Sequence, residues 1–262
     1  MTVNNINFND YFNHALLRKF LLKYIFGFIF ICFIFTVKAK DLSLEVVSEH
    51  WPPFIIQNAE KAEDVSGIVT NKIKDILTLS NLNYTINTYP WARSYHLATT
   101  KPNVLIYSIY KTKKRAPHFT WFCPIHPKTP VNIYKLRNNK TDITTLTSLK
   151  KAVIGVLRND NSHNYMLNNG FTVGGNLTVS SNEESNIKNL LNGKIDAVIQ
   201  SREALIYRLQ ATGFTIDDLE VGFQLHQNMS TEHCMALSKG SSPEVISALE
   251  TAFNLWQAQQ KK

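Results

Sequence analysis

The chain has 262 residues, of which 44% are hydrophobic and 18% are charged, and its formal net charge is +8. This composition is typical of a globular protein and excludes an intrinsically disordered chain. The length suits one large domain or two small ones. Apart from a cluster at 111–115, the basic residues are scattered. The sequence therefore lacks the dense basic stripe of a nucleic-acid-binding protein, and we expect no nucleic-acid partner.

Residues 1–39 have the pattern of a secretory signal peptide. Basic residues precede an apolar run at 24–37, and Val37-Lys38-Ala39 places small side chains at the −3 and −1 positions of a cleavage site. The run is shorter than the roughly 20 apolar residues that a membrane-spanning helix needs. We expect cleavage and export to the periplasm, with an uncleaved anchor or a later start codon as the alternatives.

Beyond residue 39 the sequence contains two cysteines, Cys123 and Cys234. Export permits a disulfide between them, but isolated cysteines are also common as buried thiols, so both interpretations stay open. The chain has no Cys/His spacing of a zinc site, no phosphate-binding loop and no Gly-x-Ser-x-Gly motif. We therefore expect no metal and no cofactor.

The first half of the exported chain alternates strands and helices. The predicted elements are strands at 42–47, 84–88 and 104–107, a helix after Gly67 and a short helix at 91–97 behind Pro90. The first helix has an apolar face made of Ile68, Val69, Ile73, Ile76 and Leu77. Alternation of strand and helix is typical of a parallel sheet with helices packed on it.

The second half repeats this order. Strands are predicted at 131–136, 152–157, 195–199, 219–225 and 234–237, with a final helix at the C-terminus. Capping residues mark the helix starts: Ser181 with Glu184, Ser201, Ser241 with Glu244, and one of Asp160, Asn161 or Ser162.

The stretch 103–124 has the construction of a small-anion site. The apolar strand turns polar at Ser108 and continues into a cationic loop that ends at Arg115. A strand that places donors at its carboxyl end is a common arrangement at ligand sites. Ser108 and Tyr110 occupy alternate positions, so we expect both to point to the same face. The alternative is an ordinary surface loop with solvated charges.

Short motifs follow one another along nearly the whole exported chain. They are Trp51-Pro52-Pro53-Phe54, Gly67, Ser108 with Thr112-Lys113-Lys114-Arg115, Phe119 to Pro124, Thr147-Ser148-Leu149 with Val153-Ile154-Gly155-Val156, and Leu191 to Ala197. Each is weak alone. In this order and spacing they resemble the motifs of the family 3 extracellular solute-binding proteins, the amino-acid-type periplasmic binding proteins.

The resemblance implies an α/β, two-lobed periplasmic binding protein-like fold, in which each lobe is a mostly parallel sheet with flanking helices and two hinge crossings join the lobes. Lobe 1 would comprise 40–130 and 229–262, and lobe 2 would comprise 131–228. A ligand would sit in the cleft and draw the lobes together by a hinge motion. Both cysteines would then lie in lobe 1 near the crossings, where pairing is geometrically possible.

The resemblance also implies roles for individual residues. Arg115 corresponds to the arginine that holds the ligand's α-carboxylate, a task suited to the planar guanidinium fork. Trp51 corresponds to an aromatic ring that stacks on the ligand. In lobe 2, backbone donors at a helix amino terminus would suit an anion. The expected ligand-binding residues are Trp51, Ser108, Tyr110, Arg115, Arg158, Asn161 and Ser201.

One position departs from the family pattern. The amino-acid binders have an aspartate that accepts from the ligand's α-ammonium, and Ser201 stands in its place here. A serine cannot neutralise an ammonium. The sequence therefore predicts either a carboxylate ligand without an α-amine or an atypical amine partner, for which Asp160 is a candidate. Arg93 either contributes to an anion-binding cleft or forms a structural ion pair.

The resulting prediction is a monomeric periplasmic solute-binding protein, not an enzyme, that captures a small carboxylate or amino-acid-like ligand for an ABC transporter or a sensor. One alternative is a degenerate binding domain that recognises a partner. A second is a periplasmic dehydratase-like enzyme on the same scaffold, for which Glu49 and His50 beside Trp51 are the obvious general acids.

Overall fold

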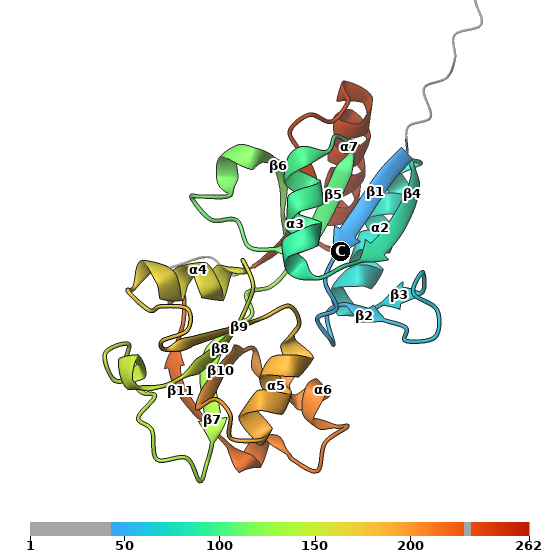
Figure 1. The fold of residues 1–262 in the computed structure, drawn as a ribbon. Helices are drawn as coiled ribbons and strands as arrows, with labels where there is room; N and C mark the ends of the chain where they lie inside the picture. Colours follow the sequence, from blue (N-terminus) through green and yellow to red (C-terminus); the bar gives the residue numbers. More distant parts are fainter. Residues whose placement is uncertain (1–42, 228–231, 262) are drawn as a thin grey trace, which may run out of the picture. The chain divides into compact units, whose positions relative to one another are not determined.

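The computed structural model describes residues 43–227 and 232–261, so the predicted signal peptide at 1–39 lies outside the described residues. Within those ranges, two five-stranded sheets carry helices on their faces (Figure 1). No helix in the described part of the chain is long and apolar enough to cross a membrane. The predicted two-lobed α/β fold class is confirmed.

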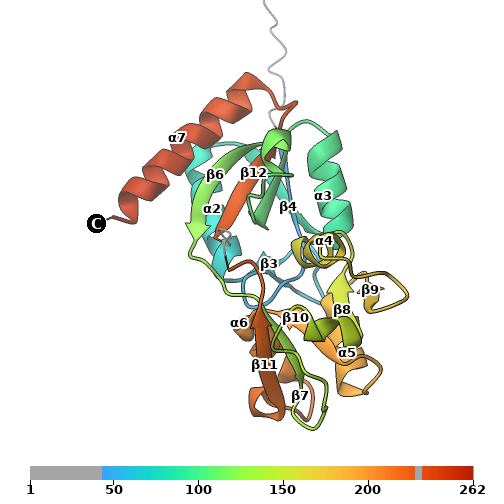
Figure 2. The same cartoon turned by 90° about the vertical axis from the view of Figure 1, so that its left-hand side faces the viewer.

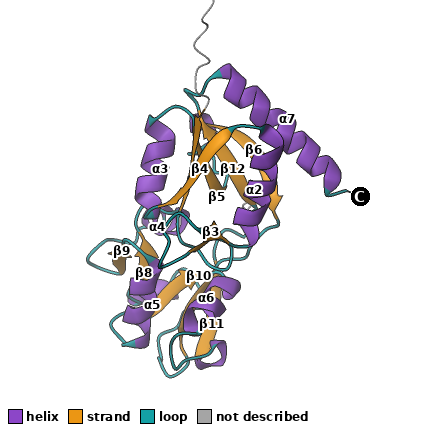
Figure 3. Cartoon of the chain, turned by 90° about the vertical axis from the view of Figure 1, so that its right-hand side faces the viewer, coloured by secondary structure: helices purple, strands orange, loops and turns teal. Residues whose placement is uncertain are grey.

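The first sheet is built from the two ends of the described chain. Its strands are β1 (Ser43–Ser48), β4 (Asn83–Thr88), β5 (Val104–Ile109), β6 (Phe119–His126) and β12 (His233–Ser238), in the order β4-β1-β5-β12-β6. Its helices are α2 (Ile68–Ser80), α3 (Trp91–Thr100) and α7 (Pro243–Gln259). Figure 3 shows α2 and α7 over one face of the sheet and α3 over the other. Small elements complete this part: β2 (Ile56–Gln57), β3 (Val65–Ser66) and the 3-10 turn η2 (Ala116–His118).

The second sheet is built from the middle of the chain. Its strands are β7 (Asn132–Leu136), β8 (Ile154–Leu157), β9 (Leu177–Ser180), β10 (Ala197–Gln200) and β11 (Leu219–Gln224), in the order β11-β7-β10-β8-β9. Its helices are α4 (Asn161–Asn168), α5 (Glu183–Leu191) and α6 (Arg202–Leu209), with 3-10 turns η3 (Ser148–Lys151) and η4 (Ile216–Asp218). Buried side chains of α5 and α6 share one cluster with β7 and β10, so both helices pack on one face.

The sheets contain more antiparallel pairing than the mostly parallel sheets that were expected. In the first sheet β1 runs parallel to β4 and β5, but β12 is antiparallel to both β5 and β6. In the second, β8 is parallel to β9 and β10, but β7 is antiparallel to β10 and β11. The reason is that β12 and β7 begin at the crossings, where β5 and β10 end, and so must run in the opposite direction.

The start of α2 depends on Gly67. Its φ of 116° is a backbone conformation that a residue with a side chain rarely adopts, and a Cβ there would lie 2.6 Å from the carbonyl oxygen of Phe54. The predicted apolar face of α2 is buried with one exception. Ile68, which was placed on that face, is the first residue of the helix and is 46% exposed.

Two capping predictions were wrong by one residue. The α5 cap is Asn182, whose side chain accepts from the Ser185 N–H at 2.9 Å, and not Ser181. The α7 cap is Ser242, and not Ser241, whose hydroxyl accepts from the backbone N–H of Asn103 at 3.0 Å. In each case two adjacent polar residues could serve, and the path of the incoming chain selects the second.

Two crossings join the sheets, one between β6 and β7 and one between β11 and β12 (Figure 2). Residues 228–231 of the second crossing lie outside the described residues. Cys123 in β6 and Cys234 in β12 form a disulfide with an S–S distance of 2.04 Å, which decides between the two interpretations that the sequence left open. The bond joins β6, where the first crossing starts, to β12, where the second crossing ends.

Candidate ligand-binding site

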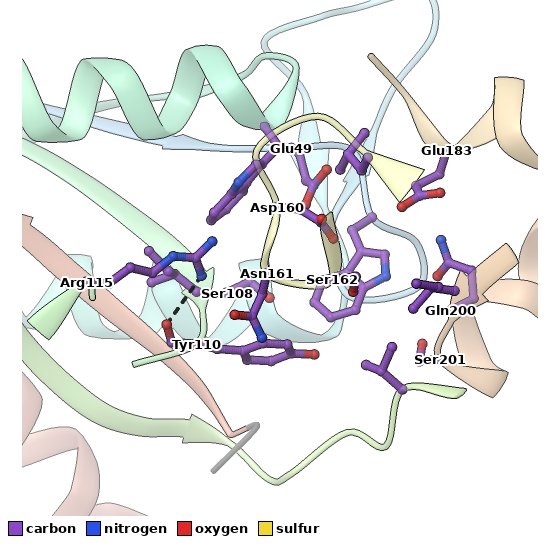
Figure 4. Close-up of a pocket in the computed structure, with 16 residues that line it drawn as sticks. Glu49, Ser108, Tyr110, Arg115, Asp160, Asn161, Ser162, Glu183, Gln200 and Ser201 are labelled. Carbon is purple, nitrogen blue, oxygen red and sulfur yellow. Dashed lines mark hydrogen bonds between the residues drawn. The ribbon is translucent and has the colours of Figure 1, made fainter. Parts of the chain in front are cut away.

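A cavity of about 60 Å³ lies where the ends of β1, β5, β8 and β10 meet (Figure 4). All the predicted ligand-binding residues except Arg158 line it: Trp51, Ser108, Tyr110, Arg115, Asn161 and Ser201. Arg158 follows β8, where its backbone N–H bonds to the Ser180 carbonyl, and its side chain is exposed. The structure therefore does not bring Arg158 to the cavity.

Arg115 forms the cationic end of the cavity. The residue is 6% exposed, and its Nη1 donates to the carbonyl oxygen of Tyr110 at 3.3 Å. Its guanidinium lies 4.9 Å from the ring centre of Trp91 and 5.4 Å from that of Tyr95, which are cation–π distances. Burial lowers the pKa of Arg115, yet a guanidinium remains charged in proteins. A guanidinium has five N–H donors, so several remain for a ligand.

Ser108 does not follow the strand alternation that was predicted for it. Its φ is 60°, and the pairing of β5 with β12 shifts register at this point, so Ser108 occupies a β-bulge. Ser108, Ile109 and Tyr110 all line the cavity in succession. Ser108 and Tyr110 therefore reach the same cavity, as predicted, but Ile109 between them lines it too, because a bulge cannot be read from an alternating pattern.

A buried histidine fixes the Ser108 hydroxyl. The Ser108 Oγ lies 2.7 Å from Nδ1 of His233, and Nε2 of the same ring lies 2.9 Å from Oγ1 of Thr129. Burial lowers the pKa of His233 to about 3, so the ring is neutral at physiological pH. The His233 ring also stacks on Trp51, with centroids 5.1 Å apart. His233 lies in β12, the strand that follows the second crossing, and its contacts hold Trp51 and Ser108 at the cavity.

The second sheet contributes the opposite wall through the start of α4. Asp160 caps this helix, since its carboxylate accepts from the His163 N–H at 2.6 Å. Next to it, Nδ2 of Asn161 lies 2.9 Å from Nε2 of His226. The Trp91 indole N–H donates to the Asn159 carbonyl at 3.0 Å, and this bond joins the two walls directly.

Three carboxyl groups line the cavity. Of these, only Asp160 was considered as a ligand-binding residue from the sequence. The three groups are Glu49 after β1, Asp160 before α4 and Glu183 in the first turn of α5. Figure 4 shows Arg115 on one side and Glu183, Gln200 and Ser201 on the other. Ser201 itself caps α6 by accepting from the Ala204 N–H at 3.3 Å, as predicted. Trp91, Glu183 and Gln200 were missed, although each stands at the start of a helix or the end of a strand.

Burial and mutual repulsion raise the pKa values of these carboxyl groups. Burial, before all other causes, raises the pKa of Asp160 to about 6 and that of Glu183 to about 7. Burial also raises the pKa of Glu49 well above its usual value, and the charges of Glu183 and Asp160 add to this effect. The anionic side of the cavity is therefore partly protonated near neutral pH.

The other charged candidates lie outside the cavity. Arg93 is exposed and its guanidinium stacks 4.2 Å from the ring centre of Tyr89, so its contact is neither an ion pair nor part of the cavity wall. His50 accepts from the Gln57 N–H at 3.1 Å and does not line the cavity. Within the described ranges, no group of three or more His, Cys, Asp or Glu residues is arranged to hold a metal ion.

The protein without ligand should lose stability as the pH rises from 6.5 to 8.5. A carboxyl group with a raised folded-state pKa binds more protons in the folded state, so the free energy of unfolding falls as the pH rises between its unfolded and folded pKa values. For Glu183 that window runs from 4.5 to about 7, and for Glu49 it extends higher. Buried His226 and His233 have lowered pKa values and act in the opposite sense, but only below 6.5.

Thermal unfolding at the two pH values measures this effect. We expect a loss of about 1 kcal/mol from Glu183 over this range, or roughly 2–4 °C in melting temperature. The variant Glu183→Gln should show a smaller fall than the parent protein. A melting temperature that is constant or rises over the same range would contradict the assignment of raised pKa values.

Comparison with known proteins found similarity in structure only. No protein-family model and no curated protein matches the chain. A histidine kinase sensor domain with similarity to periplasmic binding proteins has a TM-score of 0.69 and 14% identity, over 84% of this chain and 92% of that chain. An ancestral arginine-binding protein bound to arginine has a TM-score of 0.67 and 17% identity, over 84% and 94%.

A third solved structure gives the same result. An amino acid ABC transporter substrate-binding protein from Streptococcus pneumoniae, bound to L-arginine, has a TM-score of 0.66 and 20% identity, over 86% of this chain and 90% of that chain. At such low identities the likeness establishes the fold alone. The described residues adopt the two-lobed α/β fold of the periplasmic binding proteins.

Proposed function

We propose that this protein is an exported solute-binding protein of the family 3 type, which captures a small carboxylate-bearing, amino-acid-like ligand in the cavity. The observation that carries the proposal is the buried Arg115 guanidinium at the cavity wall, with donors left over for a carboxylate. Such a charge is costly to bury unless an anion meets it. Trp51, Ser108, Tyr110, Asn161 and Ser201 are the further ligand contacts in this proposal.

The two sheets support a hinge mechanism for capture. In this proposal lobe 1 comprises 40–130 and 229–262, lobe 2 comprises 131–228, and the ligand closes the lobes by bonding to both. Cavity residues come from the parts of the chain around both sheets: Arg115 follows β5 of the first sheet, and Asn161 begins α4 beside the second. Binding of one ligand by both would favour the closed arrangement.

The structural neighbours support two destinations for the captured ligand. Among them are a transporter substrate-binding protein and a histidine kinase sensor domain. We propose a periplasmic monomer that delivers its ligand to an ABC transporter permease, or whose ligand-bound form is recognised by a sensor. The neighbours that bind arginine and glutamine favour a ligand of the amino-acid class.

A thermal-shift screen tests the proposal. The purified protein is heated with L-amino acids, dicarboxylates such as succinate, and aromatic acids. A ligand at about 100 times its Kd stabilises the folded state by about 2.7 kcal/mol, which for a chain of this size raises the melting temperature by roughly 5–10 °C. If no compound in the three classes raises it, the proposed function is wrong, and recognition of a protein partner becomes the better interpretation.

A further inference from the structure

The carboxyl groups on the cavity wall form no salt bridge within the described residues. Glu49, Asp160 and Glu183 come from three separate elements and line the same cavity. The ion pairs among the described residues join Glu184 to His50 and Arg208, and Glu220 to Lys135, and include none of the three.

Arg208 is the arginine whose charge acts on Glu49 and Glu183, and two of its nitrogens bond to other groups. Arg208 donates from Nε to Glu184 at 3.3 Å and from Nη2 to the carbonyl oxygen of His50 at 3.2 Å. The bonds that Asp160 and Glu183 do make come from neutral donors, the His163 N–H at 2.6 Å and the Asn186 amide at 3.1 Å. Neutral donors leave the negative charge of a buried carboxylate uncompensated.

An independent observation also points to a ligand group at this wall. Tyr110 is only 8% exposed, and its hydroxyl is a buried group without a hydrogen-bond partner in the described part of the chain. The residue lines the cavity, and Figure 4 shows its ring among the lining side chains with the hydroxyl directed away from Arg115. The charges of Asp160 and Glu49 act on this hydroxyl and raise its pKa, after burial itself. Buried hydroxyls are nearly always paired, so a ligand atom is the expected partner.

We propose that Glu49, Asp160, Glu183 and the Tyr110 hydroxyl form a subsite for a protonated amine or guanidinium of the ligand, and that the subsite releases protons as it fills. The inference rests on the proposed function, because the cation belongs to the same ligand whose carboxylate meets Arg115. The subsite would also give the ligand's amine a partner, although position 201 carries a serine in place of the family's aspartate.

Proton release follows from the charges that face each carboxyl group. Glu49 faces Glu183 and Glu184 of α5, Asp160 before α4 and Arg208 of α6. Asp160 faces Arg115, and Glu183 faces Arg208 and Asp160. With pKa values of about 6 for Asp160 and about 7 for Glu183, the empty cavity holds protons near neutral pH. A bound cation stabilises the ionised carboxylates, lowers these pKa values and expels the protons.

Isothermal titration calorimetry in two buffers of different ionisation enthalpy counts those protons. The probes are L-arginine and L-lysine, which carry both a carboxylate and a side-chain cation, agmatine, which lacks the carboxylate, and succinate, which lacks the cation. We expect L-arginine or L-lysine to bind with release of about half a proton or more at pH 6, and with about tenfold higher affinity at pH 7.5 than at pH 5.5.

Matched variants separate the subsite from the rest of the cavity. Glu183→Gln should lower the affinity for the cationic probe about tenfold at pH 7.5 and reduce the proton count. Asp75→Asn removes the same charge from the exposed face of α2, away from the cavity, and should change neither. Tyr110→Phe should weaken binding without changing the proton count, because the hydroxyl donates or accepts but does not titrate in this range.

The possible outcomes distinguish the subsite from the proposed function. Succinate binding as tightly as the amino acids, with no proton exchange and full dependence on Arg115, would overturn the cation subsite and leave the proposed function standing. An unchanged proton count in both Glu183→Gln and Glu49→Gln would also overturn it. Agmatine binding that survives Arg115→Ala but not Glu183→Gln would support it. No binding of any probe would overturn the cation subsite, and the proposed function would then depend on the wider thermal-shift screen.

Discussion

Replacing Arg115 by alanine should lower the affinity for a carboxylate ligand about 100-fold or more. Truncating one partner of a buried, hydrogen-bonded charge pair costs about 2–5 kcal/mol, and 2.7 kcal/mol corresponds to a factor of about 100. Arg115 is 6% exposed, and its guanidinium contacts the Tyr110 carbonyl and the rings of Trp91 and Tyr95, so a bound carboxylate would pair with it away from bulk water. Titration calorimetry with a ligand identified by thermal shift measures the loss.

Two further variants show whether the effect belongs to the guanidinium. Arg115→Lys keeps the charge but loses the planar fork, and should recover only a small part of the affinity. Arg93→Ala removes an exposed arginine that stacks on Tyr89 outside the cavity, and should leave the affinity unchanged. Equal affinities of the parent and a folded Arg115→Ala variant, shown by far-UV circular dichroism, would remove the observation on which the proposed function depends.

The sequence predicted the parts of the site that short motifs carry. Arg115 and Trp51 lie on the cavity wall because each follows a strand that the apolar pattern identified. Arg158 was placed there by the same reasoning, but position next to a helix start does not determine the direction of a side chain. The geometry at Ser108 was missed as well, because its bulge arises from pairing with β12, more than 100 residues away in the chain.

The carboxyl wall could not be predicted from any single stretch. Glu49, Asp160 and Glu183 follow or precede elements of both sheets, and only the tertiary structure brings their side chains to one cavity. Two of them had other plausible roles in the sequence, Asp160 as a helix cap and Glu49 as a general acid. Asp160 does cap α4. A single residue can therefore satisfy a local rule and still belong to a site assembled from distant parts.

The disulfide gives the second large prediction. Replacing both Cys123 and Cys234 by serine should lower the free energy of unfolding by about 2–5 kcal/mol, and the melting temperature by roughly 5–15 °C. The bond closes a loop over a sequence separation of 111, which includes the whole second sheet, so its loss frees a large part of the unfolded chain. Thermal and urea unfolding, each with and without reductant, measure the difference.

The reductant provides the control for that experiment. Reduction should lower the melting temperature of the parent protein to near that of the double variant and should leave the double variant unchanged. The Cys234 side chain is fully buried, and its neighbour His233 bonds to Ser108 and Thr129. Loss of the disulfide should therefore also loosen β12, whose His233 stacks on Trp51 at the cavity. We therefore expect the reduced protein to bind its ligand more weakly as well. A parent protein whose melting temperature does not respond to reductant would show that the bond is either absent or without effect on the folded state.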